Sequence, residues 1–211
     1  VEEFEEALCA YTGARHTVVC SSGTAALHLA CMAAGIGQGD GVVTSPLTFL
    51  ASANCAAYTG ARPFFADIDP ETLNIDPVEV EKKLSENPSI KAVIPVHFAG
   101  LPCDLEKIRG LASAKGALVI DDACHALGAR WKDTKGQWHK VGSPVYSDMT
   151  VFSFHPVKSI TTCEGGAVTT NDPVLYEKLK TLRAHGVVRD RARLKNGHHA
   201  PWYYEMQSLG Y

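Results

Sequence analysis

Short apolar runs alternate with helical patterns along almost the whole chain, and this alternation limits the possible folds more than any other feature. Strands are predicted over residues 17–20, 41–45, 62–66, 91–96, 117–121, 149–154 and 166–170. Helices are predicted between them, over residues 24–34, 48–58, 77–84, 104–115 and from 173 to a stop at 185–186. Nearly continuous apolar strands separated by helices are typical of a mostly parallel sheet that helices cover on both faces. We therefore predict a three-layer α/β fold.

Length and composition exclude several classes of protein. The chain has 211 residues, of which 45% are hydrophobic, enough for one globular domain with a core. The net charge of −3 argues against a general affinity for nucleic acid or for an anionic membrane. No apolar run approaches the length of a membrane span. The seven cysteines form no C-x-x-C pair, which argues against a zinc site or redox motif and fits a reducing cytoplasm.

The two ends of the chain suggest that it belongs to a longer one. It begins at Val1 with an acidic, amphipathic segment that has none of the features of a signal peptide. Residues 189–211 show no clear periodicity and stop without a closing element, so we expect a C-terminal part to be missing. Residues 131–148 are polar and contain glycine and proline, which predicts a hairpin or a surface loop.

The first junction between a strand and a helix, Ser21-Ser22-Gly23-Thr24-Ala25, has the composition of a phosphate cradle. Glycine allows close approach of the backbone, the hydroxyls donate hydrogen bonds, and a helix N-terminus favours an anion. An ordinary Ser/Thr helix cap remains the alternative for this segment.

Two further junctions carry groups that suit a flat, charged ligand. Asp121 and Asp122 end an apolar strand, and His125 follows them. A carboxylate paired with a heteroaromatic nitrogen keeps that nitrogen protonated, although a single acid at a strand end is usually a turn former. Phe49, at another strand end, has a ring that can stack on a flat ligand, although a phenylalanine packed in the core is the commoner case.

Lys158 follows the strand predicted at 149–154 and precedes Glu164-Gly165-Gly166. An unprotonated lysine amine can condense with a carbonyl to form a Schiff base, and partial burial favours that state. On this segment alone, a surface lysine is the alternative. Ser153 adds a second hydroxyl donor beside it. Together the junctions supply a phosphate cradle, a stacking ring, an acid for a pyridine nitrogen and an amine, which are the groups that pyridoxal 5'-phosphate requires of a protein.

In combination these segments resemble the DegT/DnrJ/EryC1/StrS family of sugar aminotransferases, which are fold-type I pyridoxal-phosphate enzymes. The matching segments cover essentially the whole chain and are 22–27, 48–54, 67–69, 121–128, 152–158, 161–166 and 182–186. The run from His155 to Lys158 most resembles the branch of pseudaminic acid synthesis. The resemblance implies that residues 1–211 form the cofactor-binding large domain. It also implies transfer of an amino group from L-glutamate to a UDP-linked 4-keto-6-deoxy-N-acetylhexosamine.

The resemblance implies a role for each matching residue. Lys158 would form the Schiff base and move protons, and Asp122 would pair with the pyridinium nitrogen. Phe49 would stack on the ring, and His125 would lie by its phenolic oxygen or its face. The phosphate site would consist of Ser22, Gly23, Thr24, the backbone of Ala25, and Ser153. The substrate would contact His155, Arg183 and His185.

The chain also departs from the family pattern. Ser159 and Cys163 are unexpected residues that do not touch the proposed chemistry, and the 131–148 segment is longer than usual. The resemblance implies an N-terminal segment and a small C-terminal domain outside residues 1–211, and a homodimer with sites at the subunit interface. A dehydratase or lyase of the same fold is one alternative, although the dehydratases carry histidine in place of Lys158. A truncated remnant without catalytic activity is the other.

The remaining conspicuous residues have simpler interpretations. His198 and His199 are expected to face solvent and not to bind a metal. Trp131 and Trp138 are expected to pack the 131–148 segment. A basic cluster near the C-terminal end is expected to lie in a solvated loop. Contact with the diphosphate of a sugar nucleotide is the alternative. The cluster consists of Arg189, Arg191, Arg193 and Lys195.

Overall fold

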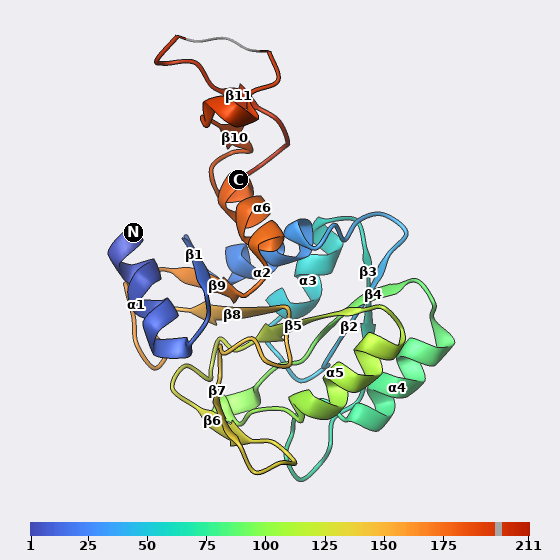
Figure 1. Cartoon of the computed structure of the whole chain (residues 1–211). Coiled ribbons are helices and arrows are strands. Elements are labelled where there is room, and N and C mark those ends of the chain that lie inside the picture. The colour runs from blue at the N-terminus through green and yellow to red at the C-terminus, as the bar shows by residue number, and fades with distance from the viewer. Residues whose placement is uncertain (197–199) are drawn as a thin grey trace.

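The computed structural model describes residues 1–196 and 200–211, so that His198 and His199 lie outside the described residues. Seven strands form one sheet: β1 His16–Cys20, β2 Gly41–Thr44, β3 Arg62–Phe65, β4 Ile90–Ile94, β5 Leu118–Asp122, β8 Met149–Ser153 and β9 Gly166–Thr170. Their order in the sheet is β1-β9-β8-β5-β4-β2-β3 (Figure 1). Every pairing is parallel except the two made by β9, which runs antiparallel to β1 and to β8. The mostly parallel sheet is therefore confirmed.

Helices cover both faces of the sheet (Figure 1). The α-helices are α1 Glu2–Thr12, α2 Gly23–Ala33, α3 Ala51–Tyr58, α4 Pro77–Glu86, α5 Leu105–Ala114 and α6 Pro173–Arg183. Two short 3-10 helices are η1 Phe98–Gly100 and η2 Arg191–Arg193. Within the described residues, no helix is both long and apolar enough to cross a membrane.

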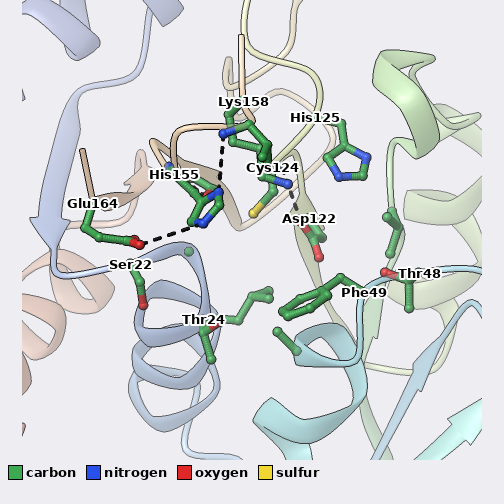
Figure 2. A pocket seen from close by; sticks show the side chains of 16 residues that line it. Ser22, Thr24, Thr48, Phe49, Asp122, Cys124, His125, His155, Lys158 and Glu164 are labelled. Atoms are coloured by element: carbon green, nitrogen blue, oxygen red, sulfur yellow. Dashed lines mark hydrogen bonds and ion pairs between the residues drawn. The ribbon is translucent and has the colours of Figure 1, made fainter. Parts of the chain in front are cut away.

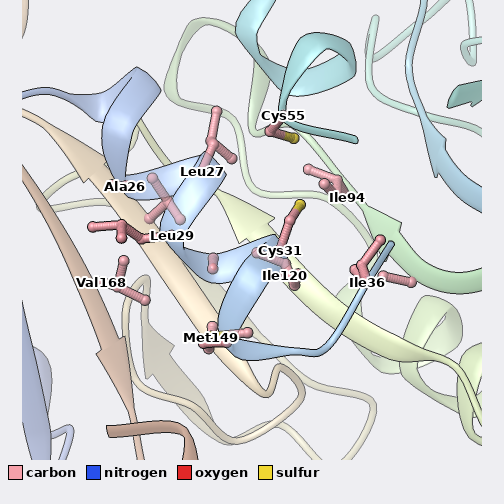
Figure 3. Close-up of a cluster of buried hydrophobic side chains, with 14 of the residues drawn as sticks. Ala26, Leu27, Leu29, Cys31, Ile36, Cys55, Ile94, Ile120, Met149 and Val168 are labelled. Atoms are coloured by element: carbon pink, nitrogen blue, oxygen red, sulfur yellow. The ribbon is translucent and has the colours of Figure 1, made fainter. Parts of the chain in front are cut away.

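The alternation of side chains along β8 divides the core into layers. Met149 and Val151 pack with α2, α3 and α6 on one face, whereas Phe152 packs with α1 on the other. Successive residues of a strand point to opposite faces, so β8 packs against helices on both faces of the sheet. Figure 3 shows the larger cluster, where Cys31 of α2 and Cys55 of α3 lie among aliphatic side chains of the sheet. Helices α4 and α5 pack in a further cluster against β2, β4 and β5.

Aspartate caps explain where three of the predicted helices begin. Asp76 accepts a hydrogen bond from the Val78 N–H at 2.8 Å, and Asp172 accepts one from the Val174 N–H at 2.7 Å. In both helices proline follows the cap, a position where its missing N–H costs nothing. Asp104 caps α5 in the same way.

The predicted elements agree with the structure to within a few residues, with one informative difference. The helix expected from residue 48 begins at Ala51, because Thr48, Phe49 and Leu50 form an irregular turn first. The sequence pattern also did not predict α1 or the small two-stranded sheet of β10 Val187–Val188 and β11 Glu205–Met206. This small sheet stands away from the main sheet (Figure 1).

The 131–148 segment contains a hairpin, as predicted, of β6 Arg130–Lys132 and β7 Trp138–Lys140. Trp131 packs against the rings of His139 and Tyr146, with centroids 4.8 and 5.2 Å apart. The Asp133 Oδ2 and His139 Nε2 atoms are 2.9 Å apart inside this hairpin. Trp138, in contrast, is 64% exposed, so the prediction that it packs the segment is wrong.

Two glycines allow the strand ends to approach the start of α2. A Cβ atom on Gly166 would lie 2.2 Å from the Ser22 carbonyl oxygen, and one on Gly23 would lie 2.8 Å from Cβ of Ser153. Both distances are too short for non-bonded atoms. The junctions after β1 and β8 are therefore in direct contact only because these two positions lack side chains.

We predict that Gly166→Ala lowers the free energy of unfolding by about 2 kcal/mol, because the added methyl group must displace backbone. The matched control is Gly110→Ala in α5, where nothing lies within 4 Å of an added Cβ. That change should raise the free energy of unfolding by about 1 kcal/mol through helix propensity. Urea unfolding measures both, and equal effects of the two substitutions would contradict the close approach at Gly166.

Candidate active site

A cavity of about 430 Å³ lies at the carboxyl ends of the parallel strands (Figure 2). Nine of the residues predicted from the sequence line it: Ser22, Gly23, Thr24, Phe49, Asp122, His125, Ser153, His155 and Lys158. Its other lining residues, which the sequence did not single out as site residues, are Leu27, Thr48, Ala51, Val96, Cys124, Val157 and Glu164. Residues from six separate stretches of the chain therefore meet in one place, as expected for a parallel sheet whose strands end at one edge.

Asp122 is a buried, hydrogen-bonded part of the cavity wall. It is 5% exposed, and its Oδ2 atom accepts a hydrogen bond from the Ser52 hydroxyl at 2.6 Å. Its Oδ1 atom accepts one from the Cys124 N–H at 3.2 Å. These two hydrogen bonds fix the direction of the carboxylate.

Ser52 was not predicted as a site residue, although it lies in a segment that carries the family resemblance. It is the second residue of α3, and its hydroxyl is also 2.7 Å from the Thr48 hydroxyl. The only hint in the sequence was its place three residues after Phe49. The row Thr48–Ser52–Asp122 thus connects the stacking segment to the acid.

Lys158 is half-buried in the loop after β8, where its backbone N–H donates to the His155 carbonyl at 2.9 Å. Burial lowers the pKa of His125, the Lys158 charge lowers it further, and the Asp122 charge opposes both. Burial raises the pKa of the Cys124 thiol; the Asp122 charge adds to this rise and Lys158 opposes it. Lys158 and Asp122 therefore act on the same two side chains, and His125 is neutral at neutral pH.

The N-terminus of α2 opens into the cavity. The Ser22 hydroxyl oxygen caps the helix by accepting from the Ala25 N–H at 3.1 Å. The N–H groups of Gly23 and Thr24 come before this one, at the end where helix N–H groups have no partner inside the helix. The helix dipole and these donors together favour an anion at this position. Ala25 itself does not line the cavity, so its predicted contact with phosphate remains a prediction.

Phe49 offers a large aromatic face to the cavity. Its side chain lies in the turn before α3 and is 62% exposed, which is unusual for a phenylalanine. In Figure 2 its ring lies across the cavity from Lys158, with Asp122 between the two. An exposed ring in this position is suited to stacking on a flat ligand.

The opening of the cavity carries His155 and Glu164. The His155 Nε2 atom is 3.8 Å from Oε1 of Glu164, and the two side chains are 46% and 62% exposed. A pair this exposed contributes little to stability. Both side chains are therefore available to contact a ligand that enters the cavity.

Arg183 and His185 do not line this cavity. Arg183 donates to the carboxylate of Glu5 and, at 3.0 Å, to the carbonyl of Val19. Both residues border another hollow of about 520 Å³, which is also lined by Arg189. Their predicted contact with substrate remains a prediction, because the geometry of this chain does not bring them to Lys158.

The residues around the cavity fit pyridoxal phosphate. The acid is buried and hydrogen-bonded on both oxygens, the helix N-terminus faces the cavity, and the amine lies opposite the aromatic ring. Gly23 adds support, because a side chain there would fill the space in front of Ser153 and Cys124. Asp122 would hold the ring nitrogen, Thr24 and Ser153 the phosphate, and Lys158 the aldehyde carbon.

Comparison with known proteins shows the family to which the chain belongs. The family model of the DegT/DnrJ/EryC1/StrS aminotransferase family matches residues 1–210. The chain is 45% identical over 211 residues to the spore coat polysaccharide biosynthesis protein SpsC of Bacillus subtilis, covering 100% of this chain and 52% of that protein. It is also 45% identical over 212 residues to the UDP-4-amino-4,6-dideoxy-N-acetyl-beta-L-altrosamine transaminase of Campylobacter jejuni, with the same coverage of 100% and 52%.

Solved structures of aminotransferases have the same fold as this chain. Helicobacter pylori PseC, described as an aminotransferase involved in the biosynthesis of pseudoaminic acid, superposes with a TM-score of 0.84 at 34% identity, over 100% of this chain and 52% of that one. The PLP-form of the putative sugar aminotransferase Spr1654 from Streptococcus pneumoniae superposes with a TM-score of 0.84 at 30% identity, over 100% of this chain and 54% of that one. The chain thus spans about half the length of the relatives it matches.

We predict that Lys158→Ala abolishes the long-wavelength absorbance that appears when pyridoxal phosphate binds as a Schiff base, because no other amine lines the cavity among the described residues. Lys158→Arg should do the same, since it keeps the charge but cannot form the bond. Lys115→Ala, at an exposed lysine after α5, is the matched control and should retain the band. A band that persists in Lys158→Ala would remove Lys158 from this role.

Proposed function

Because the chain belongs to the DegT/DnrJ/EryC1/StrS aminotransferase family, we propose that it forms the cofactor-binding part of a pyridoxal-phosphate-dependent sugar aminotransferase. In this proposal the enzyme transfers an amino group from L-glutamate to a nucleotide-linked 4-keto-6-deoxy sugar. The observation that carries the proposal is the shared cavity of Lys158 and Asp122, with Phe49 on its wall. The proposal concerns the full-length protein that contains this chain.

Asp122 is assigned the task of holding a proton on the ring nitrogen of the cofactor. The bound cofactor supplies an electron sink for the carbanion that forms when a proton leaves the carbon next to the amine. That sink works best when the ring nitrogen is protonated. A buried carboxylate fixed by Ser52 and Cys124 would give this nitrogen a charge-assisted hydrogen bond in a defined direction.

Lys158 is assigned the proton transfers. Its loop leaves β8 at Ser153 and returns to β9 at Gly166, and its side chain lines the cavity. With the cofactor bound, the Lys158 amine would accept a proton from the donor carbon and return one to the cofactor as a general base and acid. His125, neutral because of burial and the nearby Lys158 charge, accepts or donates a hydrogen bond without adding a charge beside that amine.

The assignment of the sugar rests on the named relatives. The Campylobacter jejuni relative is a transaminase named for a UDP-linked 4-amino-4,6-dideoxy sugar, and SpsC of Bacillus subtilis is named for polysaccharide biosynthesis. We infer a UDP-linked N-acetylhexosamine of this type as substrate, with a role in pseudaminic acid or a related polysaccharide pathway. His155 at the opening is assigned to the substrate, together with Arg183 and His185. Arg183 and His185 line a different hollow from Lys158, so in this proposal they reach the substrate in the assembled full-length enzyme.

We further propose that the enzyme is a cytoplasmic homodimer. Seven free thiols fit a reducing compartment. The exposed Phe49 and the distant Arg183 fit a site that a second subunit completes. The full-length protein would have this chain as its large domain, with further segments outside residues 1–211.

Two alternatives to a sugar aminotransferase can be tested by experiment. A dehydratase or lyase of the same fold would use the same cavity, but the family's dehydratases carry histidine at the position of Lys158, which argues against that branch. A remnant without activity would bind no cofactor. The groups around the cavity, several of them buried, favour an intact cofactor site over a remnant.

We predict that Asp122→Asn still binds the cofactor but slows proton abstraction by about 10²-fold or more, the scale of positioned acid–base effects. The neutral amide no longer favours a protonated ring nitrogen, although it keeps the shape of the side chain. Single-turnover absorbance with glutamate measures this step. An unchanged single-turnover rate would count against the assignment of Asp122.

The proposed reaction is tested by supplying the full-length protein with glutamate labelled with heavy nitrogen and with UDP-, dTDP- and GDP-linked 4-keto-6-deoxy sugars in turn. Mass spectrometry should find the label in the sugar, most strongly with the UDP-linked N-acetyl substrate, and Lys158→Ala should show none. Loss of water from the sugar without label would favour the dehydratase. A cofactor absorbance band without any labelled sugar would indicate that the enzyme acts on a different substrate. The absence of a band would favour the remnant.

A further inference from the structure

Directly behind Asp122 lies a pair of buried side chains that the proposed reaction does not use. His97 follows β4 and is 0% exposed, and Asp121 precedes Asp122 on β5 and is 1% exposed. Their Nε2 and Oδ2 atoms are 3.9 Å apart. Among the described residues, the buried side-chain polar atoms without a hydrogen-bond partner are His97 Nε2 and Asp121 Oδ1. Two such atoms at one place require an explanation, because each costs desolvation energy.

The bonds of His97 define which nitrogen carries the proton. Its Nδ1 atom accepts from the Cys103 N–H at 3.0 Å, so the proton of the neutral ring is on Nε2 and faces Asp121. Burial lowers the pKa of His97 to about 4, which keeps the ring neutral. The backbone N–H of His97 donates to the Asp122 carbonyl at 3.1 Å. The same residue therefore contacts the main chain of one aspartate and faces the side chain of the other.

Asp121 points away from the cavity, because neighbouring residues of a strand face opposite sides of the sheet. Its Oδ2 atom accepts from the Thr150 hydroxyl at 3.2 Å. The titratable or charged groups that face or influence it are His97 and Cys103 from the segment after β4, Asp122 on its own strand, and Asp148 before β8. Burial raises the pKa of Asp121 to about 7; the Ser147 and Thr150 hydroxyls oppose this rise, and the charges of Asp148 and Asp122 add to it.

We propose that Asp121 and His97 are positioning residues for Asp122: they fix the end of β5 and place a second carboxylate behind the cavity that favours a cation in front of Asp122. This inference rests on the proposed function, because that cation is the protonated ring nitrogen of the cofactor. A purely structural polar pair would instead be expected to satisfy its own hydrogen bonds. The hairpin pair Asp133–His139 does so, at 2.9 Å.

The charge of Asp121 should make the affinity for the cofactor depend on pH. A carboxyl group with a raised pKa is neutral below that value and charged above it. Its attraction for the bound cation is therefore present at about pH 8, above the Asp121 value, and largely lost at about pH 6. Titration of the free cofactor affects the wild-type protein and a variant equally, so the ratio of their dissociation constants isolates the contribution of Asp121.

The test compares three variants of the full-length protein in absorbance titrations with pyridoxal phosphate. Asp121→Asn keeps the shape and the acceptor for Thr150 but removes the charge. His97→Asn retains an acceptor for Cys103 and removes the N–H that faces Asp121, and it provides a second measurement if Asp121→Asn does not fold. Asp133→Asn is the matched control, because it breaks a buried Asp–His pair that does not line the cavity.

Asp121→Asn should bind the cofactor about tenfold more weakly than wild type at about pH 8, with a smaller ratio at about pH 6. His97→Asn should weaken binding in the same direction by a smaller factor, and Asp133→Asn should not change it. Equal affinities in wild type and both site variants, with only their melting temperatures lowered, would overturn the positioning role while leaving the proposed function intact. A wild-type protein that binds no pyridoxal phosphate would instead overturn the proposed function, and this inference with it.

Discussion

The main chain of Asp122 is hydrogen-bonded on both sides, and the arrangement of the site depends on it. Its N–H donates to the Pro95 carbonyl at 2.9 Å, and its carbonyl accepts from the His97 N–H at 3.1 Å. Its carboxylate is bonded to Ser52 at the start of α3. One residue thus connects the end of β5 to the segment after β4 and to a helix. A shift of Asp122 would therefore break its bonds to the segment after β4 and to α3 together.

The other groups around the cavity are held less firmly, and the difference fits their proposed tasks. Phe49 is 62% exposed, Lys158 is half-buried, and His155 lies at the opening beside Glu164. These side chains come from loops, whereas the acid lies on a central strand. An acid that holds one proton on one ring atom requires a fixed position. An amine that exchanges partners during the reaction, and a rim that admits a large substrate, require freedom to adjust.

The sequence predicted the parts of this arrangement that follow from strand order. Lys158 and Asp122 lie just beyond or at the ends of apolar strands, and parallel strands of one sheet end at one edge, so their convergence could be expected. The hydrogen bond from Ser52 to Asp122 joins residues 70 positions apart and depends on how α3 packs, which no local pattern encodes. The same holds for Arg183, whose partner Glu5 lies 178 positions away. The late start of α3 has a local cause, because residues 48–50 turn irregularly so that the Thr48 hydroxyl reaches Ser52.

Strand β9 explains why the lysine stays at the cavity. It is the antiparallel member of the sheet, inserted between β1 and β8, and its first residue, Gly166, pairs with both Cys20 and Ser153. A parallel crossover after β8 would have carried the chain to the opposite edge of the sheet. Because β9 runs the other way, the loop that carries Lys158 leaves and re-enters the sheet at the same edge, and the bond from the Phe154 N–H to the Gly165 carbonyl at 2.8 Å closes its base. The loop therefore cannot move far from the cavity unless the pairing of β8 with β9 opens, and the amine remains within reach of the site even when its side chain is released.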